Sequence, residues 1–371
     1  MPRSESTGRT TPGPAGSPAS RRPRQRDVAE LAGVSRTTVS LVLNDVDGVT
    51  IPEETRQRVW NAAAELGFQP DAMARSLRGA HSNIIGLVTS EIATTPYAVA
   101  IIKGAQDAAF ERGQTLLVID TEGEQAAAAD AVMRLRQWRA DGLILAADYH
   151  RRVELPPGLG DLPAVLVDCF VDDQEPPSGT THDDTSDARR PPLPTVLPDE
   201  LQGGRLATQT LLDAGHRRIA FINGPDGYPA SSGRLEGYRE ALAAAGVAYD
   251  PTLVRRGDWW QESASRHAAD LMGLDDPPTA LFCGNDWMAM GAYDSLRELG
   301  LSIPGDVSVI GFDNRVEIAD HMRPRLSTVA LPYRAMGHEA VGMLLDGEHP
   351  AEPVLLECPL VVRDSIAPPR T

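Results

Sequence analysis

The sequence is poor in the residues that build disulfide frameworks, membrane spans and secretion signals. Its 371 residues include only three cysteines, Cys169, Cys283 and Cys358. An odd number of widely spaced cysteines excludes a disulfide framework and a CxxC zinc knuckle. The longest apolar runs, such as residues 143–147, are far too short to span a bilayer, and no apolar stretch near the first residue indicates a signal peptide. These absences predict a soluble cytoplasmic protein with no membrane partner.

The sequence also lacks the motifs of common enzymes and metal sites. Its eight histidines form no HExxH motif, and its isolated glycine pairs form no phosphate-binding loop. We therefore expect neither enzymatic activity nor a cofactor or metal ion.

Positive charge is scarce overall but concentrated near the start of the chain. The formal net charge is −17, which argues against a protein that coats nucleic acid through a generally basic surface. Residues 1–79 nevertheless hold eleven arginines against nine acidic residues, a net charge of +2, so the rest of the chain carries −19. This asymmetry fits a small module that meets a polyanion, attached to a body that avoids it. A basic tail before an acidic domain explains the charge equally well.

The first 79 residues divide into a tail, three helices and a short segment. Residues 1–23 are rich in Pro, Gly, Ser, Thr and Arg and predict a disordered tail. The residues alone predict a plain linker over 70–79, after a three-helix unit over 24–69. Its third helix is predicted to open with a capping box at Thr50–Glu53, to run through Leu66 and to end at Gly67.

The first two helices have the spacing of a helix-turn-helix. Val28, Ala29, Leu31 and Ala32 lie on one predicted helical face, and Gly33 follows where a left-handed turn is needed. Ser35 is expected to cap a second helix that runs through Leu43, with Val39 and Val42 facing inward. The outward side chains, Ser35, Arg36, Thr37, Thr38 and Ser40, are hydrogen-bonding groups without an acid, as suits a helix in the major groove of DNA. An ordinary three-helix bundle with a glycine turn is the alternative.

After His81 the pattern becomes an alternation of strands and helices. Strands are predicted at Ile84–Val88, Leu116–Asp120, Leu143–Ala146, Ala164–Asp168, Ile219–Asn223, Ala280–Cys283 and Val307–Phe312, and helices near 97–112, 124–139, 201–214, 231–245 and 286–299. Such alternation predicts α/β architecture with doubly wound parallel sheets in two lobes. Residues 172–194 have no core pattern and are expected to be an insertion loop.

Several motifs in the expected order make the chain resemble the LacI/GalR family of bacterial transcriptional repressors. They are Asp27-Val28-Ala29-Glu30-Leu31-Ala32-Gly33-Val34-Ser35, Thr38-Val39-Ser40, Ala74-Arg75-Ser76-Leu77, Ala214-Gly215-His216-Arg217-Arg218, Asn285-Asp286 and Pro304-Gly305-Asp306-Val307-Ser308-Val309-Ile310-Gly311-Phe312-Asp313. The resemblance covers roughly residues 24–367 without the insertion. It implies a homodimer with a helix-turn-helix DNA-binding domain over 24–69, a hinge helix over 70–79 and a two-lobed, periplasmic-binding-protein-like effector domain over 80–371. The first lobe would comprise about 82–170 and 331–356, and the second about 195–330 and 357–371.

The resemblance also implies how the hinge and head bind double-stranded operator DNA. Leu77 stands where the family wedges a leucine into the minor groove, with Arg75 and Arg78 near phosphates. Leu41 stands where the family often has an arginine that reads a base, so a bidentate contact with guanine is lost. Asp71 and Arg24 also depart from the family pattern, so the operator sequence cannot be transferred from relatives.

The same register assigns effector-binding positions between the lobes. Arg234, Asn285 and Asp313 match effector contacts, and Trp259 matches an aromatic residue of the cleft. Tyr97, Asp148 and Tyr333 are further candidates. For each charged residue alone, a helix cap or a surface ion pair is the alternative, and Trp260 is expected in the core.

These features together predict a cytoplasmic repressor whose operator affinity is controlled by a small carbohydrate. A non-sugar effector, corepressor behaviour or activation stays open within the same class. A sugar-binding protein without a regulatory role is a more distant alternative, because it would lack the helix-turn-helix.

Overall fold

The computed structural model describes residues 23–43, 49–68, 82–92, 98–171 and 192–370, in two compact units. The head unit is Met1–Ala80, and the two-lobed unit is His81–Thr371. Residues 1–22 of the predicted tail, the predicted hinge at 70–79 and residues 172–191 of the insertion lie outside the described residues. In the described ranges, no helix combines the length and the apolarity needed to cross a bilayer.

The described residues of the head unit form three short helices: α1 (Gln25–Ala32), α2 (Arg36–Leu43) and α3 (Glu53–Leu66). Val28 and Ala29 of α1 pack with Val39 and Val42 of α2 in an apolar cluster that α3 completes. Gly33 ends α1 with φ of 65°, a left-handed conformation that glycine adopts without strain. The predicted spacing of Ala29, Gly33 and Val39 is therefore confirmed.

The predicted cap of α2 is present, whereas the predicted N-terminal cap of α3 is not. Ser35 Oγ accepts a hydrogen bond from the backbone N–H of Thr38 at 3.0 Å, so Ser35 caps α2 as predicted. The capping box at Thr50–Glu53 is wrong, because Pro52 is itself the N-cap of α3 and no side chain caps this helix. Pro52 has a non-helical backbone (φ −54°, ψ 138°), so the helix starts at Glu53, two residues later than Thr50 as N-cap would require. Gly67 ends α3 in a left-handed conformation, as predicted.

Leu31 is 47% exposed, although the sequence pattern places it on the buried face of α1. The buried face is formed by Val28, Ala29 and Ala32. At 100° per residue, Leu31 lies roughly a quarter turn or more from the centre of that face. It therefore sits at the edge of the cluster.

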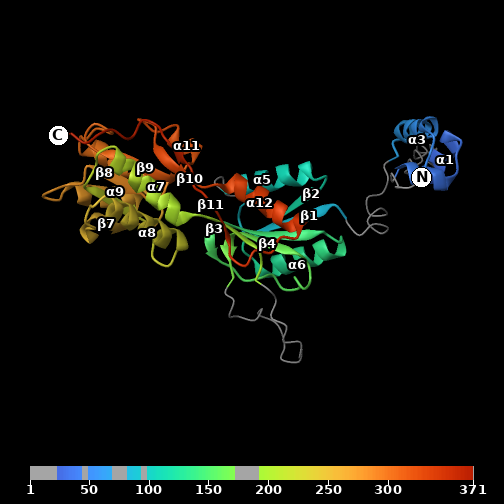
Figure 1. Cartoon of the computed structure of the whole chain (residues 1–371), viewed down its shortest axis with the longest axis horizontal. Coiled ribbons are helices and arrows are strands. Elements are labelled where there is room, and N and C mark those ends of the chain that lie inside the picture. The colour runs from blue at the N-terminus through green and yellow to red at the C-terminus, as the bar shows by residue number, and fades with distance from the viewer. Residues whose placement is uncertain (1–22, 44–48, 69–81, 93–97, 172–191, 371) are drawn as a thin grey trace, which may run out of the picture. The chain divides into compact units, whose positions relative to one another are not determined.

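The first lobe is built on a parallel sheet with strand order β11-β5-β4-β3-β1-β2. Its strands are β1 (Ile84–Thr89), β2 (Thr115–Asp120), β3 (Gly142–Arg152), β4 (Ala164–Phe170), β5 (Thr195–Pro198) and β11 (Val354–Leu356). Helices α5 (Val99–Glu111) and α12 (Tyr333–Asp346) cover one face, and α6 (Gln125–Gln137) covers the other (Figure 1). Because helices cover both faces of the sheet, strands such as β1 and β4 are continuous runs of buried, mostly aliphatic residues.

The second lobe repeats this arrangement with strand order β12-β10-β9-β8-β6-β7. Its strands are β6 (Ile219–Asn223), β7 (Val254–Arg256), β8 (Ala280–Cys283), β9 (Ser308–Asp313), β10 (Ser327–Ala330) and β12 (Leu360–Val361), of which β12 runs antiparallel to β10. One face packs against α7 (Glu200–Asp213) and α8 (Pro229–Ala244), and the other against α9 (Gln261–Met272) and α10 (Asp286–Glu298). The short helix α11 (Val316–Ala319) follows β9. The predicted doubly wound α/β lobes are confirmed.

One predicted lobe boundary is wrong. The second lobe was expected to begin at residue 195, but β5 pairs with β4 and β11 in the sheet of the first lobe. This strand has only four residues, and β11, one of its partners, comes near the end of the chain, so local pattern cannot assign it to a lobe. The predicted alternation also omits β7 and α9 and ends β3 before Arg152.

Within the described residues, the chain passes between the lobes three times. The crossings run from β5 to α7, from β10 to α12 and from β11 to β12. The backbone N–H of Asp199 donates to the carbonyl oxygen of Leu356 at 2.9 Å, which joins the first crossing to the third. The N–H of Ala330 donates to the carbonyl oxygen of Pro359 at 2.7 Å, which joins the second to the third.

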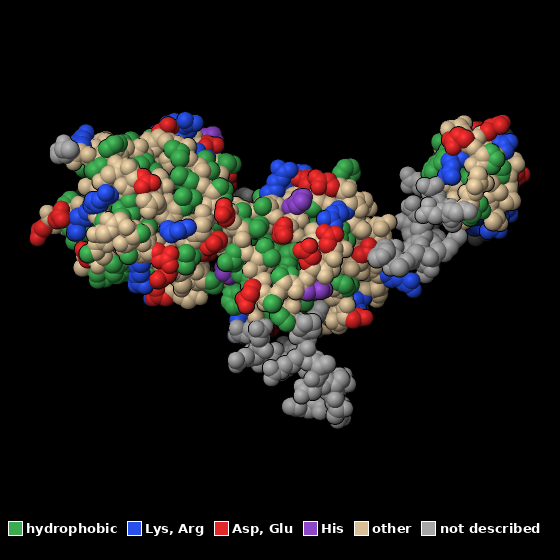
Figure 2. Space-filling view, viewed as in Figure 1, with side chains coloured by type: hydrophobic (Ala, Val, Ile, Leu, Met, Phe, Trp, Pro, Cys, Tyr) green, Lys and Arg blue, Asp and Glu red, His purple; other side chains and the backbone are tan. Residues whose placement is uncertain are grey.

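Charged side chains of both signs are interspersed over the face of the two-lobed unit seen in Figure 2. Many of them form surface ion pairs, such as Arg134 with Asp130 and Arg112 with Asp346. The acidic excess of this unit therefore does not form one uninterrupted acidic surface on the face shown. All three cysteines are buried and free.

Candidate functional site

The outer face of α2 carries the predicted DNA-reading residues of the head unit. Ser35, Arg36 and Thr37 are exposed, and Thr38, Ser40 and Leu41 are half-buried. The Ser35 and Thr38 hydroxyls lie 2.9 Å apart and hydrogen-bond to each other. Arg36 is thus the exposed charged side chain at the start of this helix. Arg75, Leu77 and Arg78, predicted to bind the minor groove, lie outside the described residues.

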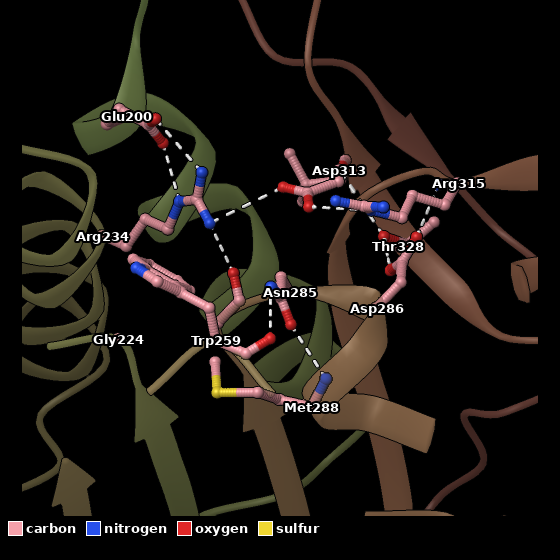
Figure 3. Close-up of polar contacts among 12 residues, drawn as sticks. Glu200, Gly224, Arg234, Trp259, Asn285, Asp286, Met288, Asp313, Arg315 and Thr328 are labelled. Atoms are coloured by element: carbon pink, nitrogen blue, oxygen red, sulfur yellow. Dashed lines mark hydrogen bonds and ion pairs between the residues drawn. The ribbon is translucent and has the colours of Figure 1, made fainter. Parts of the chain in front are cut away.

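In each lobe, the strand order reverses beside the first strand, which is β1 in one lobe and β6 in the other. Ligands of open α/β sheets bind at the carboxyl ends of strands at such a reversal. The predicted effector residues Arg234, Trp259, Asn285 and Asp313 gather at this edge of the second lobe (Figure 3). Tyr97 lies outside the described residues.

Asn285 fixes the position of Trp259. The Asn285 side chain accepts a hydrogen bond from the Met288 N–H at 2.8 Å, which caps α10, and donates to the Trp259 carbonyl oxygen at 3.1 Å. The indole ring of Trp259 lies against Gly224, where a Cβ atom would come within 2.1 Å of the ring. Trp259 has φ of 72°, so the chain turns sharply and holds its ring at the end of β6.

Arg234 is almost completely buried and already holds three partners. Its Nε donates to Glu200 at 2.7 Å and its Nη2 donates to the second Glu200 oxygen at 3.1 Å, as a bidentate pair. Its Nη1 donates to the Gly284 carbonyl oxygen and lies 3.8 Å from an Asp313 oxygen. Only 4% of the Arg234 side chain is exposed, so the guanidinium is part of the floor of the site (Figure 3). Glu200 was not predicted from the sequence.

Asp313 is the last residue of β9 and has a strained backbone conformation, and the buried Asp286 lies beneath it. Asp313 has φ of 96° and lies 3.5 Å from the Arg315 guanidinium. Beneath it, Asp286 accepts a hydrogen bond from the Arg315 N–H at 2.6 Å and another from the Thr328 hydroxyl at 2.7 Å. Burial raises the pKa of Asp286 to about 8, and the neighbouring Asp313 carboxylate adds to this shift. Burial also raises the pKa of Asp313.

The first lobe contributes Asp148, Asp168 and Tyr333, all buried. Asp148 lies within β3 and forms an ion pair with Arg151 at 3.6 Å. Asp168 lies near the end of β4, and one of its buried carboxylate oxygens has no hydrogen-bond partner. Burial raises its pKa well above the usual range, and the charges of Glu200 and Asp148 raise it further. Asp168 of the first lobe therefore lies within electrostatic range of Glu200 of the second.

A cavity of about 310 Å³ opens at the carboxyl ends of β1 and β3. Its polar lining includes Thr89, Ser90, Thr121, Arg151 and Glu154. Arg151 donates to the Ser90 hydroxyl at 2.6 Å. The reversal point of the first lobe is therefore hollow, with polar side chains on a largely apolar wall.

Aromatic rings from both lobes form a row beside these polar groups. The Tyr149 ring of the first lobe lies 5.7 Å from the Tyr228 ring of the second, and the Tyr228 ring lies 6.1 Å from Trp259 in an edge-to-face arrangement. Tyr228 was not predicted, although it directly precedes the proline that starts α8. Trp260, expected in the core, is 63% exposed, because the backbone turn at Trp259 directs the two rings apart.

Comparison with known proteins agrees with this architecture. Residues 26–71 match the lacI family of bacterial regulatory proteins, and residues 208–366 match a periplasmic binding protein-like domain. The chain is 34% identical over 323 residues to the HTH-type transcriptional repressor PurR of Proteus mirabilis, covering 86% of this chain and 89% of the relative.

Two solved structures extend the similarity to both units. The Lac repressor dimer bound to operator and the anti-inducer ONPF is 28% identical with a TM-score of 0.71, covering 94% of this chain and 100% of that one. The transcriptional regulator CelR in complex with cellobiose is 34% identical with a TM-score of 0.59, covering 93% of this chain and 100% of that one. The chain therefore belongs to the LacI family and is a DNA-binding transcriptional regulator, not an enzyme.

Proposed function

We propose that this regulator is a dimeric repressor whose affinity for operator DNA is controlled by a small carbohydrate bound between the two lobes. The observation that carries the proposal is the convergence of buried polar groups from both lobes near the carboxyl ends of their strands. Asp168 of the first lobe interacts electrostatically with Glu200, Arg234 and Asp313 of the second. A ligand held by both sets of groups favours one arrangement of the lobes over others, which is the requirement for control by an effector.

DNA reading is assigned to the outer face of α2. Arg36 is exposed at the start of the helix that enters the major groove in helix-turn-helix proteins. Its guanidinium can bind guanine with two hydrogen bonds. One such head buries too little surface for tight specific binding, so two copies on a palindromic operator are expected. The Lac repressor dimer bound to operator supports this assignment by similarity.

The carbohydrate assignment rests on the aromatic row and on Asp313. Sugars are held by side chains that accept hydrogen bonds from their hydroxyl groups and by aromatic rings against their apolar faces. Tyr149, Tyr228 and Trp259 supply the rings, and Asp313 supplies two acceptor oxygens. The cellobiose complex of CelR supports a carbohydrate ligand by similarity. In this assignment Arg234 acts mainly by holding Asp313 in place.

The test is selection of operator fragments from a bacterial genome with the full chain, followed by titration of the selected operator. We expect a palindromic site bound by two copies, with release on addition of a sugar such as cellobiose. Sedimentation of the complex measures the number of copies. A monomer on the operator, or a complex that no sugar affects, would contradict the proposal. Tighter binding with sugar would make the protein a corepressor-dependent regulator at the same site.

A further inference from the structure

The charged groups at the junction of the lobes leave one carboxylate without a counterion. Among the described residues, the Asp148 carboxylate pairs with Arg151 at 3.6 Å, and Glu200 pairs with Arg234 at 2.7 Å. Asp313 lies 3.8 Å from Arg234 and 3.5 Å from Arg315. In the described ranges, these carboxylates and Asp168 meet three guanidiniums, and Asp168 is in no such pair. Asp286, a fifth buried carboxyl group, accepts hydrogen bonds from the Arg315 N–H and the Thr328 hydroxyl instead.

Asp168 is only 1% exposed, and within the described part of the chain one of its oxygens makes no hydrogen bond. A buried polar group without a partner is costly, and a buried unpaired charge is more so. No cationic side chain of the described residues forms an ion pair with Asp168, and the Arg234 charge, which acts on it from the second lobe, is paired with Glu200. His150 of the same lobe stays neutral, since burial lowers its pKa, and Tyr333, which also faces Asp168, can carry no positive charge. Asp286 interacts with Asp313 and Arg315 and adds no positive charge near Asp168.

The same contacts make the site unfit for an anion. The guanidinium of Arg234 would be the natural partner of a phosphate or carboxylate on a ligand. Here the Nε and Nη2 donors bind the two Glu200 oxygens, and Nη1 donates to the Gly284 carbonyl oxygen with Asp313 3.8 Å away. An anionic ligand would have to displace Glu200 and then lie beside Asp168.

We propose that the effector carries a protonated amine that Asp168 binds, so that its class is an amino sugar rather than a neutral or phosphorylated sugar. Burial favours the neutral acid form of Asp168 while no cation is paired with it. A ligand ammonium brings three donors and a positive charge, so its binding stabilises the Asp168 carboxylate, releases the proton and gives the unpartnered oxygen a donor. Asp313 and the aromatic row then hold the hydroxyl groups and the ring. This inference rests on the proposed function, because it specifies the ligand of the same site.

The test compares four β-1,4-linked disaccharides that differ at one kind of substituent. They are the glucosamine disaccharide, cellobiose, the N-acetylated glucosamine disaccharide and cellobiose phosphate. Binding to the full chain is measured by calorimetry, with the thermal midpoint as a second readout. We expect the free amine to bind at least ~10-fold more tightly than each of the other three, as a hydrogen bond between charged groups allows.

Asp168→Asn is the matching variant, because it keeps the size of the side chain and removes the charge. We expect the preference for the amine over cellobiose to fall below about threefold in this variant. Asp364→Asn, in a surface pair with Arg325, is the control and should keep the full preference. If Asp168→Asn does not fold, the pH dependence of the unmodified protein replaces it. The preference for the amine over cellobiose should then weaken as pH rises through the pKa of the amine, and also as pH falls and Asp168 keeps its proton. A preference that does not change with pH overturns the assignment.

The outcomes separate the two proposals. Equal or tighter binding of cellobiose, its phosphate or the N-acetyl form overturns the amine assignment and leaves a carbohydrate effector in place. A preference that survives Asp168→Asn also overturns it. Binding of calcium chloride alone at Asp168 would assign the carboxylate to a metal ion instead. Failure of all four disaccharides to bind contradicts the amine and the carbohydrate effector together.

Discussion

Arg234 and Glu200 form a bidentate ion pair that links the first turn of α7 to α8 inside the second lobe. The two hydrogen bonds measure 2.7 and 3.1 Å, and both side chains are at most 6% exposed. The pair closes the floor beneath Asp313 and Trp259. Its geometry therefore sets both the stability of the lobe and the charge that a ligand meets.

Removal of one partner of this pair should destabilise the protein strongly. Glu200→Ala leaves the Arg234 guanidinium buried beside Asp313 alone, and we expect a loss of about 3–5 kcal/mol in the free energy of unfolding. Urea denaturation measures it. The control is Asp346→Ala, which breaks a bidentate pair with Arg112 of similar geometry on the surface, where screening by water leaves the midpoint nearly unchanged. Equal losses in the two variants would mean that burial of the Arg234 pair has no special effect.

The buried Asp286 should make stability fall as pH rises. Its pKa is about 8 in the folded protein against an ordinary value of 3.8, so the folded state binds a proton more tightly than the unfolded state. Unfolding then releases this proton between about pH 4 and pH 8, and the stabilisation is lost as pH approaches 8. Asp286→Asn does not titrate, so its thermal midpoint should decline less between pH 5.5 and pH 8 than that of the unmodified protein. Parallel declines would show that Asp286 is ionised throughout that range.

Gly224 should be irreplaceable because the Trp259 ring occupies the position of its side chain. A Cβ atom at residue 224 would lie 2.1 Å from the indole, so Gly224→Ala must move the ring, at a cost of about 1–3 kcal/mol. We expect weaker binding of the effector and a changed tryptophan emission spectrum. Gly342→Ala is the control, because the nearest atom to its Cβ is 3.9 Å away and the residue is within α12. It should be neutral or stabilising by up to about 1 kcal/mol.

Arg36 should contribute sequence preference and not only affinity. Arg36→Ala is expected to weaken operator binding by about 1–3 kcal/mol and to relax the preference at one position in each half-site. Arg36→Lys keeps the charge but not the two-pronged donor, so it should regain binding to random DNA without regaining the preference. Fluorescence titrations with the operator and with single-base variants measure both effects. An equal loss on operator and random DNA would limit Arg36 to a phosphate contact.

Substitutions in the effector site and in the hinge should have opposite effects on the response to effector and on operator affinity. Asp313→Ala is expected to abolish the response to effector while operator affinity without effector stays within about twofold. Leu77→Ala, in the hinge outside the described residues, should leave binding of the effector unchanged and weaken operator binding, because the minor-groove wedge is lost. Titration of each variant on labelled operator, with and without effector, measures both. An unchanged response in Asp313→Ala would place the effector elsewhere.

Local sequence patterns predict this fold well because its elements depend on near neighbours. Gly33 and Val39 specify the turn and the packing of α1 and α2 within a few residues, and the strand Ala280–Cys283 is a continuous buried run. By contrast, β5 depends on β4 and on β11, which lies far along the chain. Its lobe therefore cannot be determined from its own four residues.

For a similar reason, the sequence predicts only some residues of the candidate site. Arg234, Asn285, Trp259 and Asp313 are identified by motif register, which fixes type and order. Glu200 follows an N-capping aspartate and has the pattern of an ordinary acidic residue in the first turn of a helix. Its role depends on Arg234, which packs against it only because α7 and α8 lie side by side. Asp168, at the end of a buried strand, carries no local signal that its oxygen lacks a partner.

The three crossings between the lobes have a mechanical consequence. The third crossing is hydrogen-bonded to the first through Leu356 and Asp199 and to the second through Pro359 and Ala330. Three separate linkers would let the lobes slide, tilt and twist independently. Crossing segments that are hydrogen-bonded to one another bend together. They therefore act as one pivot and restrict the lobes to rotation about it. Because Glu200 follows Asp199 directly, the floor of the site turns with the second lobe, while Asp168 turns with the first.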